Sequence, residues 1–354
     1  MKFLILGAGR QGTVIAADIL SAGDHEVTVA DRNASSLESV QRRFPGITVR
    51  IIDVNELWDV ARALSGMDVC VSAVPYFYNL ILATTAVENG VHFCDLGGSG
   101  QIVMKQLRLD AQARENGVAL IPDCGLSPGL TNILAAHVIS QLDRVDSLEI
   151  RAGGVPGLLS ANGLLNRYLE PAGVVKNGQF LRLDSLTESE PICFEGYPDL
   201  ETFYANGGLS TLPETYAARV KNIRHKTIGH KGLASSIRAI VRDPRFKSRG
   251  EIGAYLESAI PAAGPDVVLV RVTGIGSARV QYEVIEGGDP ETGFSAMMRV
   301  CGVSAAIIAE LLAAGRFEPG AHVLEKVVSP DEFVSELAKR GIRVRRSLEA
   351  ENAI

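Results

Sequence analysis

Cysteine is scarce in this chain: five cysteines stand far apart in 354 residues, with no CxxC pair. Such spacing predicts neither a zinc site nor a disulfide framework, and it fits a reducing, cytoplasmic compartment. A long hydrophobic run is also missing, because no stretch approaches the roughly eighteen residues that span a bilayer. The first residues read as a short buried strand with no basic leader. We therefore expect no signal peptide and no membrane partner.

Positive charge is not in excess either. The formal net charge is −6 and no block of lysine and arginine reverses it, which argues against nucleic acid as a partner. Hydrophobic residues make up 46% and charged residues 21%, proportions that are ordinary for a globular enzyme. A chain of this length can hold two domains, each with its own core. A two-domain enzyme with a small-molecule substrate is the expected class.

What the chain does have is a glycine-rich turn near its start. An apolar run at residues 2–6 leads into GAGRQG, and an apolar helical pattern follows. A second short strand ends at Asp31, nineteen residues past Gly12, which completes the fingerprint of a dinucleotide-binding loop. Gly7 permits the tight turn, Gly9 lets the backbone approach a pyrophosphate, and Gly12 lets helix and strand pack closely.

Asp31 also bears on the choice of coenzyme. A carboxylate at this position accepts hydrogen bonds from the adenosine ribose and repels a 2′-phosphate, which favours NAD over NADP. The neighbouring Arg32 weakens that preference, because a guanidinium can pair with the phosphate. NAD is the expected cofactor, and NADP stays open.

Strands and helices alternate through short connections as far as the strand at residues 118–121. This rhythm predicts an α/β fold with a Rossmann-type, doubly wound parallel sheet and right-handed crossovers. Ligands of such sheets lie beyond the carboxyl ends of the strands. Asp53 lies near the adenine or, equally, is a turn acid. The residues that we expect at the cofactor are Gly7, Gly9, Arg10, Gln11, Gly12, Asp31, Arg32, Asp53, Ala73, Val74, Pro75, Asp95 and Cys124.

A second informative stretch, PDCGLSPG, covers residues 122–129. Ser127 as N-cap and Pro128 as first helical residue predict a helix from here to about Gln141. Asp123 then lies on a strand-to-helix loop facing the reactive end of the cofactor, where a carboxylate binds or deprotonates an ammonium group. An acid that only caps the turn is an equal alternative. Cys124 is a reactive thiol or, more commonly, a buried structural cysteine.

Beyond Gln141 the alternation stops. Strands at residues 267–274 and 278–286, joined at Gly276-Ser277, have a hairpin signature and predict a mixed or antiparallel sheet. A large sheet with an apolar face could carry a homodimer contact. A strongly apolar helix is predicted near residues 296–314, and Ser329-Pro330 begins the last helix.

Several motifs together resemble the saccharopine dehydrogenase and lysine 6-dehydrogenase family, most closely its lysine 6-dehydrogenase branch. They are GAGRQG at 7–12, CDLGG at 94–98, PDCGLSPG at 122–129, GGVP at 153–156, TLPETY at 211–216 and the Gly229-His230 pair. The resemblance implies a dinucleotide domain at residues 1–125, an inserted α+β substrate and dimerisation domain at 126–292, and a C-terminal segment at 293–354 whose helices return to the first domain. It also implies a homodimer and NAD-dependent oxidation of a carbon–nitrogen bond, with the ε-amine of L-lysine as substrate.

A zwitterionic substrate needs cations or amide donors for its carboxylate and acceptors for its ammonium. The candidate substrate-binding residues are Asn166, Tyr168, Glu214, Tyr216, Arg224 and Lys226. Arg224 or Lys226 would hold the carboxylate, and a base would deprotonate the ammonium before hydride leaves its carbon. The candidate catalytic bases are Asp123, His225 and His230. The alternative for the segment at 219–231 is a solvated basic face.

No metal is expected, because His225 and His230 are five residues apart and no carboxylate completes a ligand triad. Two other classes of protein stay open. One is a saccharopine or carboxynorspermidine type of dehydrogenase, acting on a secondary amine with NADP. The other is a catalytically silent dinucleotide-binding regulator.

Overall fold

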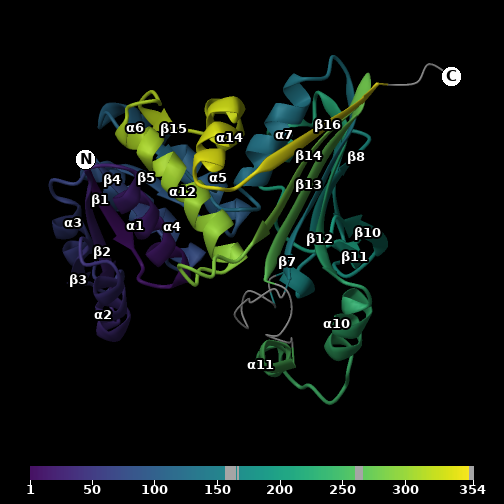
Figure 1. The fold of residues 1–354 in the computed structure, drawn as a ribbon, viewed down its shortest axis with the longest axis horizontal. Coiled ribbons are helices and arrows are strands. Elements are labelled where there is room, and N and C mark those ends of the chain that lie inside the picture. The colour runs from purple at the N-terminus through teal and green to yellow at the C-terminus, as the bar shows by residue number, and fades with distance from the viewer. Residues whose placement is uncertain (156–164, 166, 260–265, 351–354) are drawn as a thin grey trace. The chain divides into compact units, whose positions relative to one another are not determined.

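The computed structural model describes residues 1–155, 165, 167–259 and 266–350. The chain divides into two compact units, and each is assembled from two segments (Figure 1). The first unit comprises Met1–Ile133 and Met298–Gly341, and the second Leu134–Met297 and Ile342–Ile354. The boundaries therefore fall inside helix α7 (Leu130–Ser140) and helix α12 (Ala296–Ala313).

The first unit is built on a seven-stranded sheet in the order β15-β6-β5-β4-β1-β2-β3, with every neighbouring pair parallel. Its strands are β1 (Lys2–Leu6), β2 (Glu26–Asp31), β3 (Thr48–Ile51), β4 (Val69–Ser72), β5 (His92–Asp95), β6 (Ala119–Ile121) and β15 (Gly320–Ala321). The chain runs outward from β1 in both directions, so the order reverses between β1 and β4. This is the doubly wound Rossmann arrangement, and the predicted fold class is confirmed.

The helices of the first unit connect these strands. They are α1 (Arg10–Ala22), α2 (Ala34–Arg43), α3 (Leu57–Leu64), α4 (Asn79–Glu88), α5 (Gly100–Gln106), α6 (Asp110–Glu115), α13 (Leu324–Val327) and α14 (Pro330–Lys339), with α12 shared. Ser329 caps α14 as predicted, since its hydroxyl accepts a hydrogen bond from the Glu332 amide. The predicted start of α7 is wrong. Ser127 and Pro128 form a turn closed by the bridge between Leu126 and Gly129, and the helix begins at Leu130.

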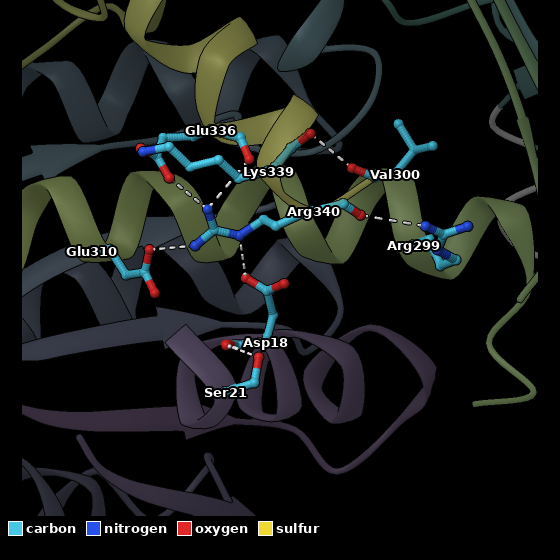
Figure 2. A network of polar contacts seen from close by, with 9 residues as sticks. Asp18, Ser21, Arg299, Val300, Glu310, Glu336, Lys339 and Arg340 are labelled. Carbon is cyan, nitrogen blue, oxygen red and sulfur yellow. Dashed lines mark hydrogen bonds and ion pairs between the residues drawn. The ribbon is translucent and has the colours of Figure 1, made fainter. Parts of the chain in front are cut away.

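The C-terminal helices are tied to α1 through one arginine. Figure 2 shows the Arg340 guanidinium reaching three carboxylates on three helices. It donates to Asp18 Oδ2 of α1 at 2.8 Å, to Glu310 Oε2 of α12 at 2.5 Å and to Glu336 Oε2 of α14 at 2.7 Å. Burial raises the pKa of Asp18 and of Glu310, although Arg340 opposes it. The cluster therefore holds α12 and α14 against the helix that follows the glycine turn.

Helix α12 corrects one expectation from the sequence. It is 18 residues long and apolar enough to cross a membrane by length and composition. The expectation that no run approaches that length is therefore wrong. Two thirds of the helix is buried inside the structure, and at Gly302 an added Cβ would lie 2.7 Å from Val14 of α1. A core helix with such packing passes the same test, so α12 is weak evidence for a membrane span.

The second unit is built on a nine-stranded mixed sheet, as predicted (Figure 1). Along the order β10-β11-β12-β7-β13-β14-β16, only β12 and β7 pair in parallel. Its strands are β7 (Val145–Val155), β8 (Ala172–Lys176), β9 (Gln179–Leu183), β10 (Glu190–Phe194), β11 (Tyr197–Phe203), β12 (Val220–His230), β13 (Val267–Gly276), β14 (Ala278–Gly287) and β16 (Val344–Ala350). Helices described in this unit, besides the end of α7, include α9 (Leu212–Tyr216), α10 (Leu233–Val241) and α11 (Arg249–Ala259).

The last strand departs from the expected organisation. Residues 293–354 were expected to return to the first domain, but β16 pairs antiparallel with β14 and extends the second sheet. Only residues Met298–Gly341 of that segment belong to the first unit. The predicted hairpin is present as β13 and β14, where Ile275 pairs with Arg279. At Gly276 an added Cβ would lie 1.8 Å from the Arg144 carbonyl oxygen, so the turn requires glycine.

Candidate functional site

The glycine turn has the geometry that its fingerprint predicts. Gly7 has a φ of +113°, and an added Cβ there would lie 2.8 Å from the Ala73 carbonyl oxygen. At Gly12 an added Cβ would lie 1.8 Å from the Gly7 carbonyl oxygen, so only glycine lets α1 pack this close to the turn. At Gly9 no protein atom lies within 4 Å of an added Cβ. The two outer glycines serve the fold, and the middle one faces open space.

The start of α1 fits a phosphate group. Gly9 is its N-cap residue, no side chain caps the helix, and its first turn contains no acidic residue. Arg10 is exposed and Gln11 is partly buried at this end. The uncapped amides and the positive end of the helix dipole together make an anion-binding terminus. This chain's own residues thus match the pyrophosphate of a dinucleotide.

Asp31 lies beside that turn at the end of β2. Its carboxylate accepts hydrogen bonds from the Ala8 amide at 2.7 Å and from the Asn33 amide at 2.8 Å. These hydrogen bonds show that Asp31 orders the glycine turn, beside which it was predicted to bind the adenosine ribose. The neighbouring Arg32 is exposed. The strand-end residues after β4 adjoin the same turn, since an added Cβ on Gly7 would lie 3.3 Å from Val74. Ala73 and Val74 are partly buried and Pro75 is exposed.

Asp53 and Asp95 were both predicted to contact the cofactor. In the structure each of these carboxylates accepts hydrogen bonds from groups of the protein itself. Asp53 Oδ1 accepts from the Asn55 amide and side chain, and these hydrogen bonds hold the Asp53 pKa below its usual value. It is the turn acid that the sequence left as an alternative. Asp95 is completely buried and accepts from Gly97, Gln106 and Asp123, so its side chain links three segments inside the unit. Burial raises the Asp95 pKa.

Asp123 follows β6 and is 2% exposed, with a φ of +67°. An added Cβ on Gly97 would lie 2.0 Å from Asp123 Oδ1, so glycine after β5 is what lets this carboxylate take its place. Cys124 beside it is buried, and burial raises its pKa well above the usual value. The thiol therefore stays protonated, which contradicts the reactive-thiol interpretation. As a cofactor residue, Cys124 can offer its backbone only.

Two residues that support this loop were not identified from the sequence. The side-chain amide of Asn132 on α7 donates to Glu325 Oε2 on α13 at 3.4 Å, and its oxygen accepts from the Gly129 amide at 3.4 Å. Both side chains are buried. Glu325 is 193 residues away in the chain, so local spacing could not have indicated it. A buried Asn within the apolar pattern of α7 was the available signal.

The predicted substrate residues of the second unit lie along one strand, β12. Side chains of a strand alternate between its two faces, so Arg224 and Lys226 share one face and His225 points to the other. His230 is exposed at the end of the same strand. The strand therefore separates His225 from the predicted cations, whereas His230 lies on the face of Arg224 and Lys226, four residues beyond Lys226.

Arg224 and Lys226 are neutralised by carboxylates of other strands of the same sheet. Arg224 pairs with Glu149, and Lys226 Nζ lies 2.6 Å from Glu190 Oε1 and 2.7 Å from the Glu188 carbonyl oxygen. Glu149 also accepts from Arg151 at 2.6 Å. Burial by itself raises the Glu149 pKa, but the hydrogen bonds from Arg224 and Arg151 outweigh it and hold that pKa low. The segment is therefore not a solvated basic face. Its two cations, Arg224 and Lys226, already pair with carboxylates of the protein.

His225 is 2% exposed and packs against Gly208, where an added Cβ would lie 2.4 Å from its ring. Burial, with the charge of Arg167, lowers the His225 pKa to about 3, so the ring is neutral near pH 7. Of the other candidates, Tyr168 is buried with its ring centroid 6.2 Å from that of Phe203, and burial raises its pKa. Glu214 is exposed and Tyr216 partly buried on α9. Asn166 lies outside the described residues.

A parallel sheet with a glycine turn, an uncapped helix start and an acid at the end of β2 defines a dinucleotide-binding protein of the Rossmann class. The family model for the saccharopine dehydrogenase NADP binding domain matches residues 3–121, and the model for the saccharopine dehydrogenase C-terminal domain matches residues 125–342. The chain belongs to the saccharopine dehydrogenase family. Its first unit is thus a nicotinamide dinucleotide-binding domain.

Two relatives share about a fifth of their aligned residues with this chain. Saccharopine dehydrogenase [NADP(+), L-glutamate-forming] of Schizosaccharomyces pombe is 22% identical over 68% of this chain and 57% of that protein. Carboxyaminopropylagmatine dehydrogenase of a Synechocystis species is 19% identical over 96% of each chain. The chain thus spans little more than half the length of the yeast relative. Apo saccharopine dehydrogenase from Saccharomyces cerevisiae, 16% identical, matches with a TM-score of 0.78 over 99% of this chain and 100% of its own, which shows the same fold.

Proposed function

We propose that this protein is an NAD(P)-dependent oxidoreductase that oxidises a carbon–nitrogen bond of an amino acid. The observation that carries the proposal is the glycine turn with the uncapped start of α1 and Asp31 beside it, in the first unit. The family membership supports the same conclusion, because both family models that match are those of a dehydrogenase. The finer proposal is oxidative deamination of the ε-amine of L-lysine with NAD.

The preference for NAD is argued from Asp31. Its carboxylate is fixed at the end of β2 by the Ala8 and Asn33 amides, and a fixed negative charge there repels a 2′-phosphate. The exposed Arg32 is the residue that could accommodate that phosphate instead. The S. pombe relative carries NADP in its name, so coenzyme choice is a point on which this chain is proposed to differ from that relative.

Asp123 is the base that we propose for proton removal. It follows β6 at the carboxyl end of the parallel sheet, where ligands of this fold gather. A carboxylate attracts the substrate ammonium and can take its proton, whereas the neutral His225 offers no charge for that purpose. The nicotinamide, when bound, accepts the hydride. Two residues position Asp123. Asp95 accepts a hydrogen bond from the Asp123 amide, and Gly97, which has no side chain, leaves room for the Asp123 carboxylate.

A secondary amine with NADP is the second candidate, and the relatives favour it. Their names denote saccharopine and carboxyaminopropylagmatine as the compounds on which those proteins act. The secondary-amine reaction releases an amine-bearing product, while the primary-amine reaction releases ammonia. The need for ammonia in the reverse direction therefore separates the two candidates.

A spectrophotometric screen tests the proposal. L-lysine, ornithine, saccharopine and related amines are each offered with NAD and with NADP, and reduction of the coenzyme is followed. The lysine assignment predicts turnover of L-lysine with NAD and ammonia-dependent reduction in reverse. Turnover of saccharopine with NADP would replace it with the second candidate. NADH binding without turnover of any amine would contradict both and indicate a regulator.

A further inference from the structure

A cavity of about 210 Å³ lies in the second unit, between the end of α10, the loop that joins β9 to β10, and the segment at residues 168–171. It has room for about seven waters, since each takes about 30 Å³ in the liquid. It is smaller than the pockets of about 300 Å³ or more that hold drug-sized ligands, so it suits a molecule of the size of an amino acid. Its described walls belong to the second unit alone, and Asp123 and the glycine turn do not contribute to them.

Two arginines bring positive charge to this cavity. Arg238 and Arg242 are four residues apart at the end of α10, so their side chains leave the same face of the helix. Like charges at this spacing repel each other unless an anion lies between them. Glu170 beside the cavity does not supply that anion, because it pairs with Arg249 at 2.7 Å. In the part of the chain that the structure describes, the Arg242 guanidinium has no ion-pair partner.

Arg238 also carries a buried hydrogen-bond donor in excess of its acceptors. Its Nη2 donates to the Leu186 carbonyl oxygen, whereas its Nε is buried and has no acceptor among the described residues. A buried donor that finds no partner costs free energy, so such groups are rare in folded proteins. Leu186 itself has a φ of +64°, a strained conformation for a branched residue and one that is concentrated at binding sites. Both features indicate a wall that is completed by a ligand.

The same cavity offers a negative charge and an apolar surface. Asp184 lines it with an exposed side chain that, within the described chain, pairs with neither arginine. The side chains of Tyr168, Leu186 and Val241 add carbon surface to the walls. Separate cationic and anionic groups with apolar walls match a zwitterion that has an apolar side chain. A simple anion matches less well, because Asp184 repels it.

We propose that this cavity is a second ligand site, which binds an α-amino acid with an apolar side chain. Arg238 and Arg242 bind the carboxylate, Asp184 binds the ammonium group, and Leu186 and Val241 contact the side chain. Binding gives the buried Nε of Arg238 its acceptor and removes the repulsion between the two guanidinium groups. The site needs no coenzyme, and the inference does not depend on the reaction proposed above.

Isothermal titration calorimetry on the full chain without coenzyme tests the ligand class. L-leucine or L-valine should bind at one site per chain. For the better of the two, the analogue without the ammonium group and the amide without the carboxylate should each bind about tenfold or more weakly. Absence of binding by both amino acids would overturn the proposal. Inorganic phosphate that binds as tightly as they do would overturn the assignment to an amino acid.

Substitutions test the place of binding. Arg242→Gln and Asp184→Asn, at two exposed positions, should each raise the Kd of the amino acid about tenfold or more with an unchanged Tm. Arg182→Gln, exposed on β9 and not part of the cavity wall, is the matched control and should bind as the wild type does. Asp123→Asn should also keep the Kd, which separates this site from the proposed catalytic one. Binding that is lost in Asp123→Asn and kept in Arg242→Gln would overturn the inference.

Discussion

The two units place their chemically active groups in different ways. In the first unit they gather where parallel strands end: Gly7 follows β1, Asp31 ends β2, Ala73 follows β4 and Asp123 follows β6. The carboxyl ends of parallel strands share one edge, so residues far apart in the chain meet there. In the second unit the charged groups of the sheet lie along strands, and cross-strand carboxylates neutralise them.

The comparison indicates that the polar groups of the first unit are available to bind a ligand, whereas the paired charges of the second unit stabilise its sheet. The first unit leaves helix amides and the open space at Gly9 for a ligand. In the described part of the second unit, Arg151, Arg224 and the buried Lys226 pair with Glu149 and Glu190, which stabilises the sheet. Four substitutions test the contrast, and they follow from the largest expected effect to the smallest.

Gly12→Val should abolish dinucleotide binding and raise the NADH Kd at least about a hundredfold, because its side chain would displace the Gly7 carbonyl from the turn. NADH fluorescence titration measures it. Gly9→Ala is the informative partner: its Cβ meets no protein atom, so lost binding with an unchanged Tm would place the ligand itself at this position. Gly250→Ala on exposed α11 is the control for both. If Gly12→Val bound NADH as tightly as the wild type, the dinucleotide would have to bind at a site other than the glycine turn.

Lys226→Met should lower the free energy of unfolding by roughly 2 to 3 kcal/mol, because it removes the partner of the Glu188 carbonyl and leaves Glu190 with Arg151 alone, at 3.6 Å. The effect lies at the low end for a buried pair, since the Glu190 side chain is 40% exposed. Urea denaturation measures it, with Lys221→Met on the same strand, 71% exposed, as a control that should change little. Unchanged stability with lost turnover would instead assign Lys226 to the substrate.

His225→Gln should make the protein less sensitive to acid. Burial lowers the His225 pKa to about 3 in the folded chain, whereas an unfolded histidine titrates near about 6.5. Between these values the unfolded chain binds more protons, so wild-type stability falls as the pH drops below about 6.5. At pH 5 the loss is about 2 kcal/mol from this group, and the variant should lack it. Urea titrations at pH 7 and pH 5 give the free energy of unfolding of the wild type, His225→Gln and the control His230→Gln. The same change of this free energy with pH in all three proteins would contradict the buried, neutral state of His225.

Asp31→Ser should shift the ratio of kcat/KM for NADP over NAD upward by about tenfold, because a fixed negative charge no longer meets the 2′-phosphate. Both coenzymes should also bind less well, since the Ala8 amide loses its acceptor. Asp53→Asn, which alters a turn acid, is the matched control and should leave the ratio unchanged. An unaltered ratio in Asp31→Ser would place the ribose away from the end of β2.

The first unit was largely predictable, because its signals are local. The glycine turn, the Asn33 cap of α2 and the Ser329 cap of α14 each depend on residues within a few positions of one another. Asp95 shows where this stops. Its strand-end position indicated a ligand contact, yet Gln106, eleven residues on, and the Asp123 amide turn it inward. Nothing in the local spacing distinguishes a buried acid from an exposed one.

The second unit was predictable only as a class of sheet. Arg224, His225 and Lys226 are consecutive and were all expected at one substrate site, whereas strand β12 places His225 on the face opposite to the other two. Their partners, Glu149 and Glu190, lie 75 and 36 residues away, so strand register decides the pairing. Register is a property of the assembled sheet. The register can be predicted from the sequence only when the first and last residues of each strand are known.

The discontinuous build of each unit bears on how the chain is synthesised. A ribosome that has released residues up to 297 has delivered the whole glycine turn, but α1 still lacks Arg340 and the two helices that it anchors. Neither unit holds all of its parts until residues 298–350 have emerged, since Arg340 and β16 both come from that stretch. Nascent chains halted before residue 340 should therefore be digested readily by protease, and chains extended beyond residue 350 should be protected in both units together.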